Sequence, residues 1–179
     1  DGADAAGHLT TSIVMSTMAR VAESRGQLAE ALALADEAVR RADASPGRLG
    51  HRFPVSVTRG RLLIELDRLS QARSVLSDGL RICEELGVRW AAATHQVYLA
   101  YGRFTAGEWD DAMAELEASL TLAGEIGEIY SLVSAYGLMA RISFYRNELG
   151  PAREAAATAA RYLAGWGNGH SLAWVAWPQ

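Results

Sequence analysis

The chain has 179 residues, half of them apolar and about a fifth charged, which suits one globular domain or a short repeat array. All 17 basic residues are arginine, and the net charge of −4 argues against a nucleic-acid-binding surface. The sequence has no uninterrupted apolar run of about 18 residues, so we expect no membrane span. A single cysteine, Cys83, excludes an internal disulfide and fits a reducing cytoplasm.

A period of about 40 residues organises the chain. Four alanines step by 41, 40 and 40 residues, namely Ala31, Ala72, Ala112 and Ala152. Four glycines step by 40 each time, namely Gly47, Gly87, Gly127 and Gly167. Such fixed-period self-similarity is typical of stacked repeat proteins. We expect one domain over residues 9–179, with units at about 9–47, 48–87, 88–127 and 128–167 and a partial fifth unit at 168–179, after a disordered or added start at residues 1–8.

The residue pattern of each unit predicts two helices. In chain order, the spacing predicts helices near residues 9–25, 28–45, 51–66, 69–86, 89–106, 109–126, 129–146, 149–165 and 169 onward. The first helix of each unit ends at a residue that tolerates a left-handed backbone, namely Gly26, Asp67, Gly107 and Asn147. The period-40 glycines are expected to end the second helices. No segment alternates with period two, so we expect no strands.

These features resemble tetratricopeptide repeats, whose pattern has a small residue within the first helix, a glycine-like turn and small residues in the second helix. The small first-helix residues here are Ala19, Gly60, Ala100 and Ala140. The family's first-helix tryptophan and tyrosine are missing, and the period is longer than the family's. The resemblance implies an all-α, right-handed α-solenoid of four antiparallel helix pairs plus a ninth helix.

Long units rich in alanine and arginine also resemble the helical-repeat region of large MalT-like regulators of the LuxR family. In that family the repeats sense effectors or contact protein partners, between an ATPase domain and a DNA-binding domain. Peptide-pheromone receptors with stretched repeats are a second relative by period. The resemblance implies that this chain is the sensor or protein-interaction segment of a larger bacterial transcription regulator. A stand-alone peptide receptor or scaffold is the alternative, followed by an enzyme with a site in the groove.

Residue patterns for catalysis, metal binding or cofactor binding are weak. The glycine-rich segment at 165–169 follows a helix and lacks the strand and lysine of a phosphate loop. The histidines His8, His51, His95 and His170 share no repeat position and no ligand spacing. No serine lies in a strand–turn–helix elbow. We therefore predict a non-catalytic protein with no metal site and no cofactor.

The predicted concave face carries an arginine row flanked by aromatic residues. The candidate binding residues are Arg20, Arg61, Tyr98, Tyr101, Phe104, Arg141, Phe144, Tyr145, Trp174 and Trp177. The planar guanidinium of arginine can donate two parallel hydrogen bonds to a carboxylate, and a tyrosine ring offers both an apolar face and a polar hydroxyl. In the alternative interpretation the aromatic rings only pack between helices and the arginines are solvated.

We expect the partner to be a protein or peptide, acidic in character, or a small-molecule effector, with no direct nucleic-acid or membrane contact from this chain. A solenoid needs a polar cap at each end, yet the sequence ends on Trp174 and Trp177. This pattern predicts a truncated unit there and self-association through it.

Overall fold

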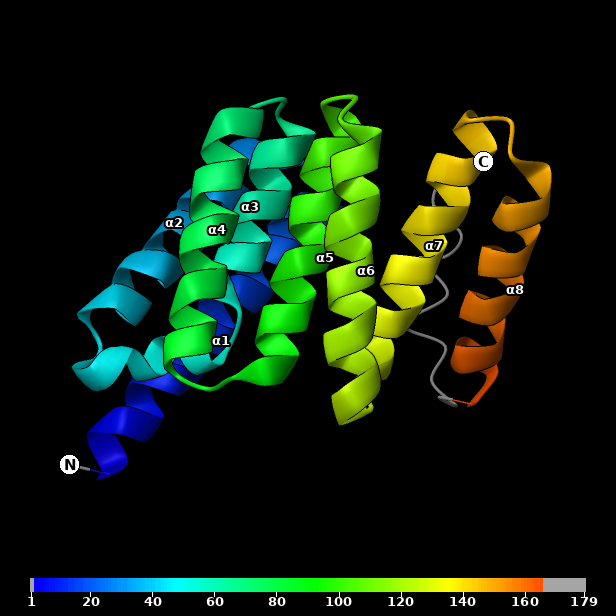
Figure 1. Ribbon diagram of the computed structural model, residues 1–179. Helices are drawn as coiled ribbons and strands as arrows, with labels where there is room; N and C mark the ends of the chain where they lie inside the picture. Colours follow the sequence, from blue (N-terminus) through cyan, green and yellow to red (C-terminus); the bar gives the residue numbers. More distant parts are fainter. Residues whose placement is uncertain (1, 166–179) are drawn as a thin grey trace.

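The computed structural model describes the backbone of residues 2–165 and the side chains of residues 7 and 10–165 (Figure 1). The elements are α1 (Gly2–Ser24), α2 (Leu28–Ala44), the 3-10 helix η1 (Pro46–Arg52), α3 (Val55–Glu65), α4 (Leu69–Glu85), α5 (Arg89–Thr105), α6 (Trp109–Ile126), α7 (Ile129–Tyr145) and α8 (Leu149–Gly165). Over residues 2–165 there is no strand. The all-α prediction is therefore confirmed for this part of the chain.

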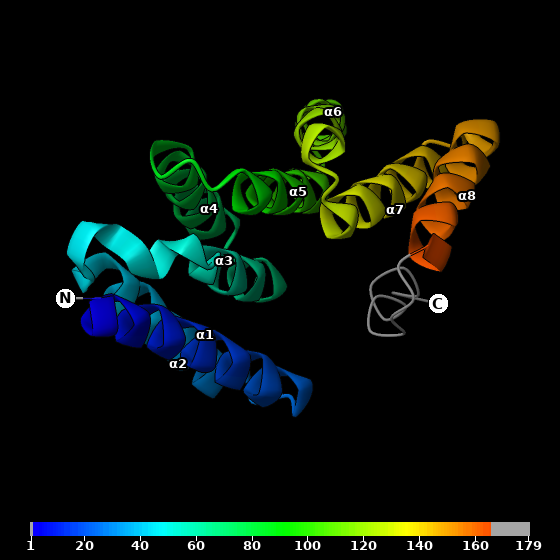
Figure 2. The same ribbon diagram turned by 90° about the horizontal axis from the view of Figure 1, so that it is seen from below.

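The helices form two layers. The inner helices α1, α3, α5 and α7 contact one another in that order, and the outer helices α2, α4 and α6 each pack both on their own inner helix and on the next one, while α8 packs on α7. Figure 2 shows α4 and α6 on one side of the row α3, α5 and α7, while α1 closes the other side of the curve. The inner helices thus line a concave face.

Left-handed residues end the first helix of every unit, as the spacing predicts. The φ angles are +75° at Gly26, +57° at Asp67, +82° at Gly107 and +62° at Asn147. At the first of these turns the N–H of Gln27 donates to the carbonyl of Ala22 over 3.0 Å. This bond satisfies a carbonyl that the helix end would otherwise leave open, and the other three turns repeat it.

Small residues let the paired helices approach closely. Ala112, three residues after Trp109, is fully buried in a core cluster with Ala100 and Leu116. At Gly60 a Cβ atom would lie 2.5 Å from Cγ of Leu76, so this position has no room for a side chain. The recurring small residues are therefore packing requirements of the fold.

Three predicted boundaries differ from the structure. Helix α1 begins at Gly2, so the expected disordered start is helical from residue 2 and the first helix does not begin near residue 9. Gly47 does not end a helix, because α2 stops at Ala44 and a 3-10 segment with left-handed Gly47 and Arg48 follows. That segment reaches into residues 51 and 52, which we assigned to the next helix, and α3 begins only at Val55. The ninth helix and Gly167 lie outside the described residues.

Among the described residues, the longest apolar helical stretches fall short of a membrane span.

Candidate functional site

A cavity of about 510 Å³ lies in the concave face. Helices α1, α3, α5 and α7 each contribute side chains to its wall. The described lining includes five of the predicted residues, Arg20, Arg61, Tyr98, Tyr101 and Arg141, together with Glu23 and Glu65. We call this the groove pocket.

One of its arginines is already paired within the chain. The Arg61 guanidinium makes two hydrogen bonds to the carboxylate of Glu23, which belongs to the neighbouring helix α1. Burial lowers the pKa of Arg61, but the Glu23 carboxylate together with the nearby Tyr98 and Tyr130 outweighs burial, and the pKa is raised overall. Arg61 therefore stays charged, and this pair ties α1 to α3.

Two tyrosines line the pocket, one on each side of a turn of α5. Tyr98 is buried, and its hydroxyl lies 3.1 Å from the hydroxyl of Tyr130. The Tyr101 hydroxyl donates to Oε1 of Glu65 over 3.3 Å. Burial raises the pKa of both Tyr98 and Tyr101, so both phenols remain neutral hydrogen-bonding groups.

The other two arginines have no carboxylate partner among the described residues. Arg20 is exposed on α1. The Arg141 guanidinium on α7 lies over the Phe104 ring, 5.0 Å from its centroid. A cation–π contact leaves the edge of a guanidinium available for an anion. These two cations, on the first and last inner helices that the structure describes, give the pocket its unsatisfied positive charge.

The predicted aromatic residues divide into two groups. Tyr98 and Tyr101 line the groove pocket, whereas Phe104 and Tyr145 form a separate cluster with Trp109 at the ends of α5 and α7. Phe144 is exposed and contacts this cluster through the edge of Tyr145. Trp174 and Trp177 lie outside the described residues.

The sequence pattern did not identify the partners of the predicted residues. Glu23 falls on the same face as Arg20, one turn along α1, yet its ion pair reaches Arg61 in the next unit. Tyr130 shares a repeat position with Trp90, but that position did not indicate its contact with Tyr98, and Glu65 was not singled out. Trp109, the first residue of α6, was not among the candidate residues, yet its ring stacks on Phe104.

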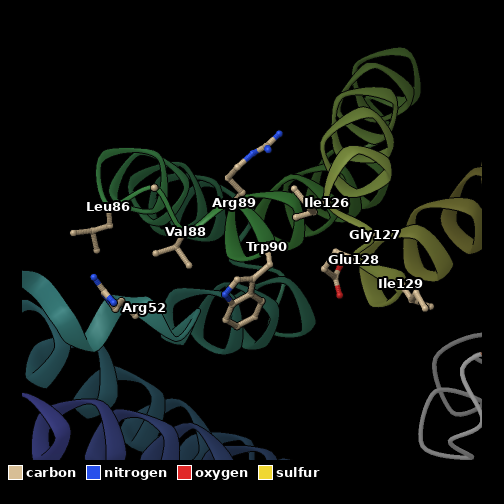
Figure 3. A pocket seen from close by; sticks show the side chains of 10 residues that line it. Arg52, Leu86, Val88, Arg89, Trp90, Ile126, Gly127, Glu128 and Ile129 are labelled. Carbon is tan, nitrogen blue, oxygen red and sulfur yellow. The ribbon is translucent and has the colours of Figure 1, made fainter.

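A second cavity of about 790 Å³ lies at the edge formed by the α4–α5 and α6–α7 loops. In the view of Figure 3 the exposed Trp90 indole lies between the side chains of Arg52 and Glu128. Glu128 is engaged as the cap of α7, because its carboxylate accepts from the backbone N–H groups of Tyr130 and Ser131. No sequence signal pointed to this loop-edge pocket.

A buried Ser–His pair lies between α3 and α5. His95 Nδ1 donates to the carbonyl of Ala91 over 2.7 Å, so Nε2 accepts from the Ser56 hydroxyl over 2.6 Å. Burial lowers the pKa of His95 to about 4, which keeps the ring neutral. Both side chains are buried from solvent. The pair therefore serves packing, and no group of residues suited to a metal ion occurs in the described part of the chain.

The comparisons support the fold. No family model matches the sequence, and no curated protein sequence matches it. Among solved structures, the crystal structure of aspartyl phosphate phosphatase F from Bacillus subtilis is similar, with a TM-score of 0.74 and 14% sequence identity. The match covers 94% of this chain and 44% of that one, so this chain spans less than half of that protein's length. The chain therefore has the fold of a tetratricopeptide-like helical-repeat solenoid.

Proposed function

We propose that this chain is a non-catalytic binding domain whose groove pocket takes an acidic segment of a protein or peptide. The observation that carries the proposal is the pair Arg20 and Arg141, two arginines without a carboxylate partner among the described residues, in a pocket that is also lined by Tyr98 and Tyr101. Guanidinium groups in this setting favour carboxylates, and tyrosine hydroxyls accept or donate to a peptide backbone.

The charge of the described lining favours an anion. It contains three arginines and two glutamates, and Glu23 is neutralised by Arg61 while Glu65 accepts from Tyr101. No histidine or cysteine occurs in that lining. Groups poised for proton transfer or nucleophilic attack need free lone pairs or a base beside them, and the two carboxylates are already engaged. We therefore favour binding over catalysis, although the similar structure is named a phosphatase.

The wider role we propose follows the sequence resemblance. The groove would be the sensor or protein-contact segment of a larger cytoplasmic transcription regulator of the MalT-like type. The alternative is a stand-alone peptide receptor or scaffold. Reading the complete gene separates them, because the regulator requires an ATPase domain and a DNA-binding domain beside the repeats.

The groove itself is tested with two labelled peptides. One is rich in glutamate and leucine, and the other has every glutamate replaced by glutamine. Fluorescence anisotropy should show binding of the acidic peptide, weakening as salt is added. The double variant Arg20→Ala, Arg141→Ala should bind it about tenfold or more weakly, since each 1.4 kcal/mol of lost contact is a factor of ten.

The matched control removes two arginines elsewhere. Arg153 and Arg161 are exposed on α8 and lie outside the described lining of the groove pocket. The double variant Arg153→Ala, Arg161→Ala has the same net charge as the groove variant and should bind the acidic peptide like the parent protein. Equal loss in both double variants would show that the peptide responds only to overall charge, and the proposal would fail.

A further inference from the structure

Glu23 is an acidic residue at a repeat position where the other three units carry apolar side chains. Aligned on the small first-helix residues, Glu23 corresponds to Ile64, Phe104 and Phe144. We call this the support position. It lies three residues after the position that we call the groove position, which holds Arg20, Arg61, Tyr101 and Arg141. Residues three apart are neighbours on a helix surface, so the two positions lie side by side on each inner helix.

The support position of one unit lies against the groove position of the next. At the three junctions that the structure describes, the two positions bring together Glu23 and Arg61, Ile64 and Tyr101, and Phe104 and Arg141. The first contact is an ion pair, the second lies in one apolar cluster, and the third is a cation–π contact. A ring holds a guanidinium without cancelling its charge, whereas a carboxylate cancels it. The residue at the support position therefore sets the charge that a groove arginine presents.

The Glu23 carboxylate binds Arg61 as a ligand carboxylate would. Its two oxygens accept from the two terminal nitrogens of the guanidinium. The side chains of Arg61 and Glu23 are only 14% and 17% exposed, so water and salt screen the pair weakly. Both residues line the groove pocket. A further carboxylate brought to Arg61 would therefore meet an occupied guanidinium edge with a negative charge beside it.

We propose that Glu23 is a specificity-determining residue of the groove pocket, because its carboxylate takes the place of a ligand carboxylate at Arg61. The groove then accepts anionic groups at Arg20 and Arg141 and a neutral part of the partner at Arg61. This inference rests on the proposed function and adds which acidic segments the groove prefers. A segment whose carboxylates are separated by neutral residues fits this arrangement, whereas an uninterrupted acidic run brings a carboxylate against Glu23, and like charges in contact disfavour binding.

The variant Glu23→Gln tests the proposal, because glutamine keeps the size of the side chain and removes its charge. In fluorescence anisotropy this variant should bind the glutamate- and leucine-rich peptide about tenfold or more tightly than the parent protein, as one additional charge-assisted contact would. Its affinity should also fall more steeply as salt is added, because a third cation takes part in binding. The peptide with glutamine in place of every glutamate should show no gain.

Two control variants separate the charge of Arg61 from other effects. Glu65→Gln makes the same change of charge in the same pocket, but Glu65 accepts from the Tyr101 hydroxyl and not from Arg61. It should strengthen binding by about two- to threefold, as expected for an exposed charge. The double variant Glu23→Gln, Arg61→Gln has the net charge of the parent protein and should lose the tenfold gain. Any loosening between α1 and α3 that follows loss of the ion pair is present in this double variant too.

The outcomes separate this inference from the proposed function. If the parent protein binds the acidic peptide but Glu23→Gln gains no more than Glu65→Gln, the inference is wrong. A gain that persists in the double variant would also overturn it, since Arg61 could not be its source. Weaker binding by Glu23→Gln would show that the pair serves only to join α1 to α3. Absence of peptide binding by the parent protein and by both single variants would instead overturn the proposed function, and this inference with it.

Discussion

The substitution Gly79→Ala tests the packing between α4 and α5 most severely. A Cβ atom at Gly79 would lie 2.2 Å from the Ser56 hydroxyl oxygen and 2.4 Å from Nε2 of His95. The new methyl group must therefore separate the buried Ser56–His95 hydrogen bond. Overpacking costs about 1–3 kcal/mol, and stranding a buried polar group costs about 1–3 kcal/mol more. Alanine favours the helix over glycine by about 1 kcal/mol, so the free energy of unfolding should fall by about 3 kcal/mol overall.

Urea unfolding followed by circular dichroism measures this loss as a lower midpoint with an unchanged slope. Gly124→Ala on α6 is the matched control, because it makes the same chemical change in an outer helix where a Cβ would meet nothing within 4 Å. That control should raise the free energy of unfolding by about 0.5–1 kcal/mol. If Gly79→Ala were stabilised as much as Gly124→Ala, the reasoning about this contact would be refuted.

Three further predictions concern the core. Ala100→Leu should lower the free energy of unfolding by about 1–3 kcal/mol, and Ala140→Leu by less, because Ala100 is fully buried and Ala140 is only half-buried; equal urea midpoints for the two would argue against tight pairing at Ala100. The pKa of His95 in the folded protein, about 4, lies below its ordinary value of 6.5. The neutral buried ring therefore contributes its full share of the free energy of unfolding above pH 6.5, and this share is lost as the pH falls towards 4. The loss is about 3 kcal/mol, and urea titrations of His95→Gln should show a flatter dependence on pH across that range. Burial raises the pKa of Cys83 to about 11, so a thiol reagent at about pH 8 should label it only after unfolding; rapid labelling of the native protein would contradict its burial.

The helices were predictable from the sequence because their ends depend on single residues. Gly26, Asp67, Gly107 and Asn147 tolerate positive φ and recur at one repeat position, so they located four turns without tertiary information. The 3-10 segment Pro46–Arg52 was missed for a related reason. Left-handed Arg48 follows left-handed Gly47 there, and an arginine, unlike an aspartate or asparagine, is not a residue type that indicates a left-handed backbone.

The pocket was only half predictable. A shared repeat position placed Arg20, Arg61 and Arg141 on one face, and the structure brings all three to the groove pocket. Which arginine is already neutralised depends on a contact between units, from Glu23 to Arg61, and repeat spacing does not encode such contacts. The same limit explains why the Ser56–His95 pair and the loop-edge pocket carried no sequence signal. Both are built from residues that come together only when neighbouring units stack.

The central claim is that the groove pocket, and not the loop-edge pocket, holds the acidic partner. A photo-cross-linking amino acid in place of Tyr101 lies in the groove pocket, and the same group in place of Trp90 lies in the loop-edge pocket. With the glutamate- and leucine-rich peptide as the probe, illumination should join the peptide to position 101 and leave position 90 unlabelled. Cross-linking from position 90, with none from position 101, would contradict the account.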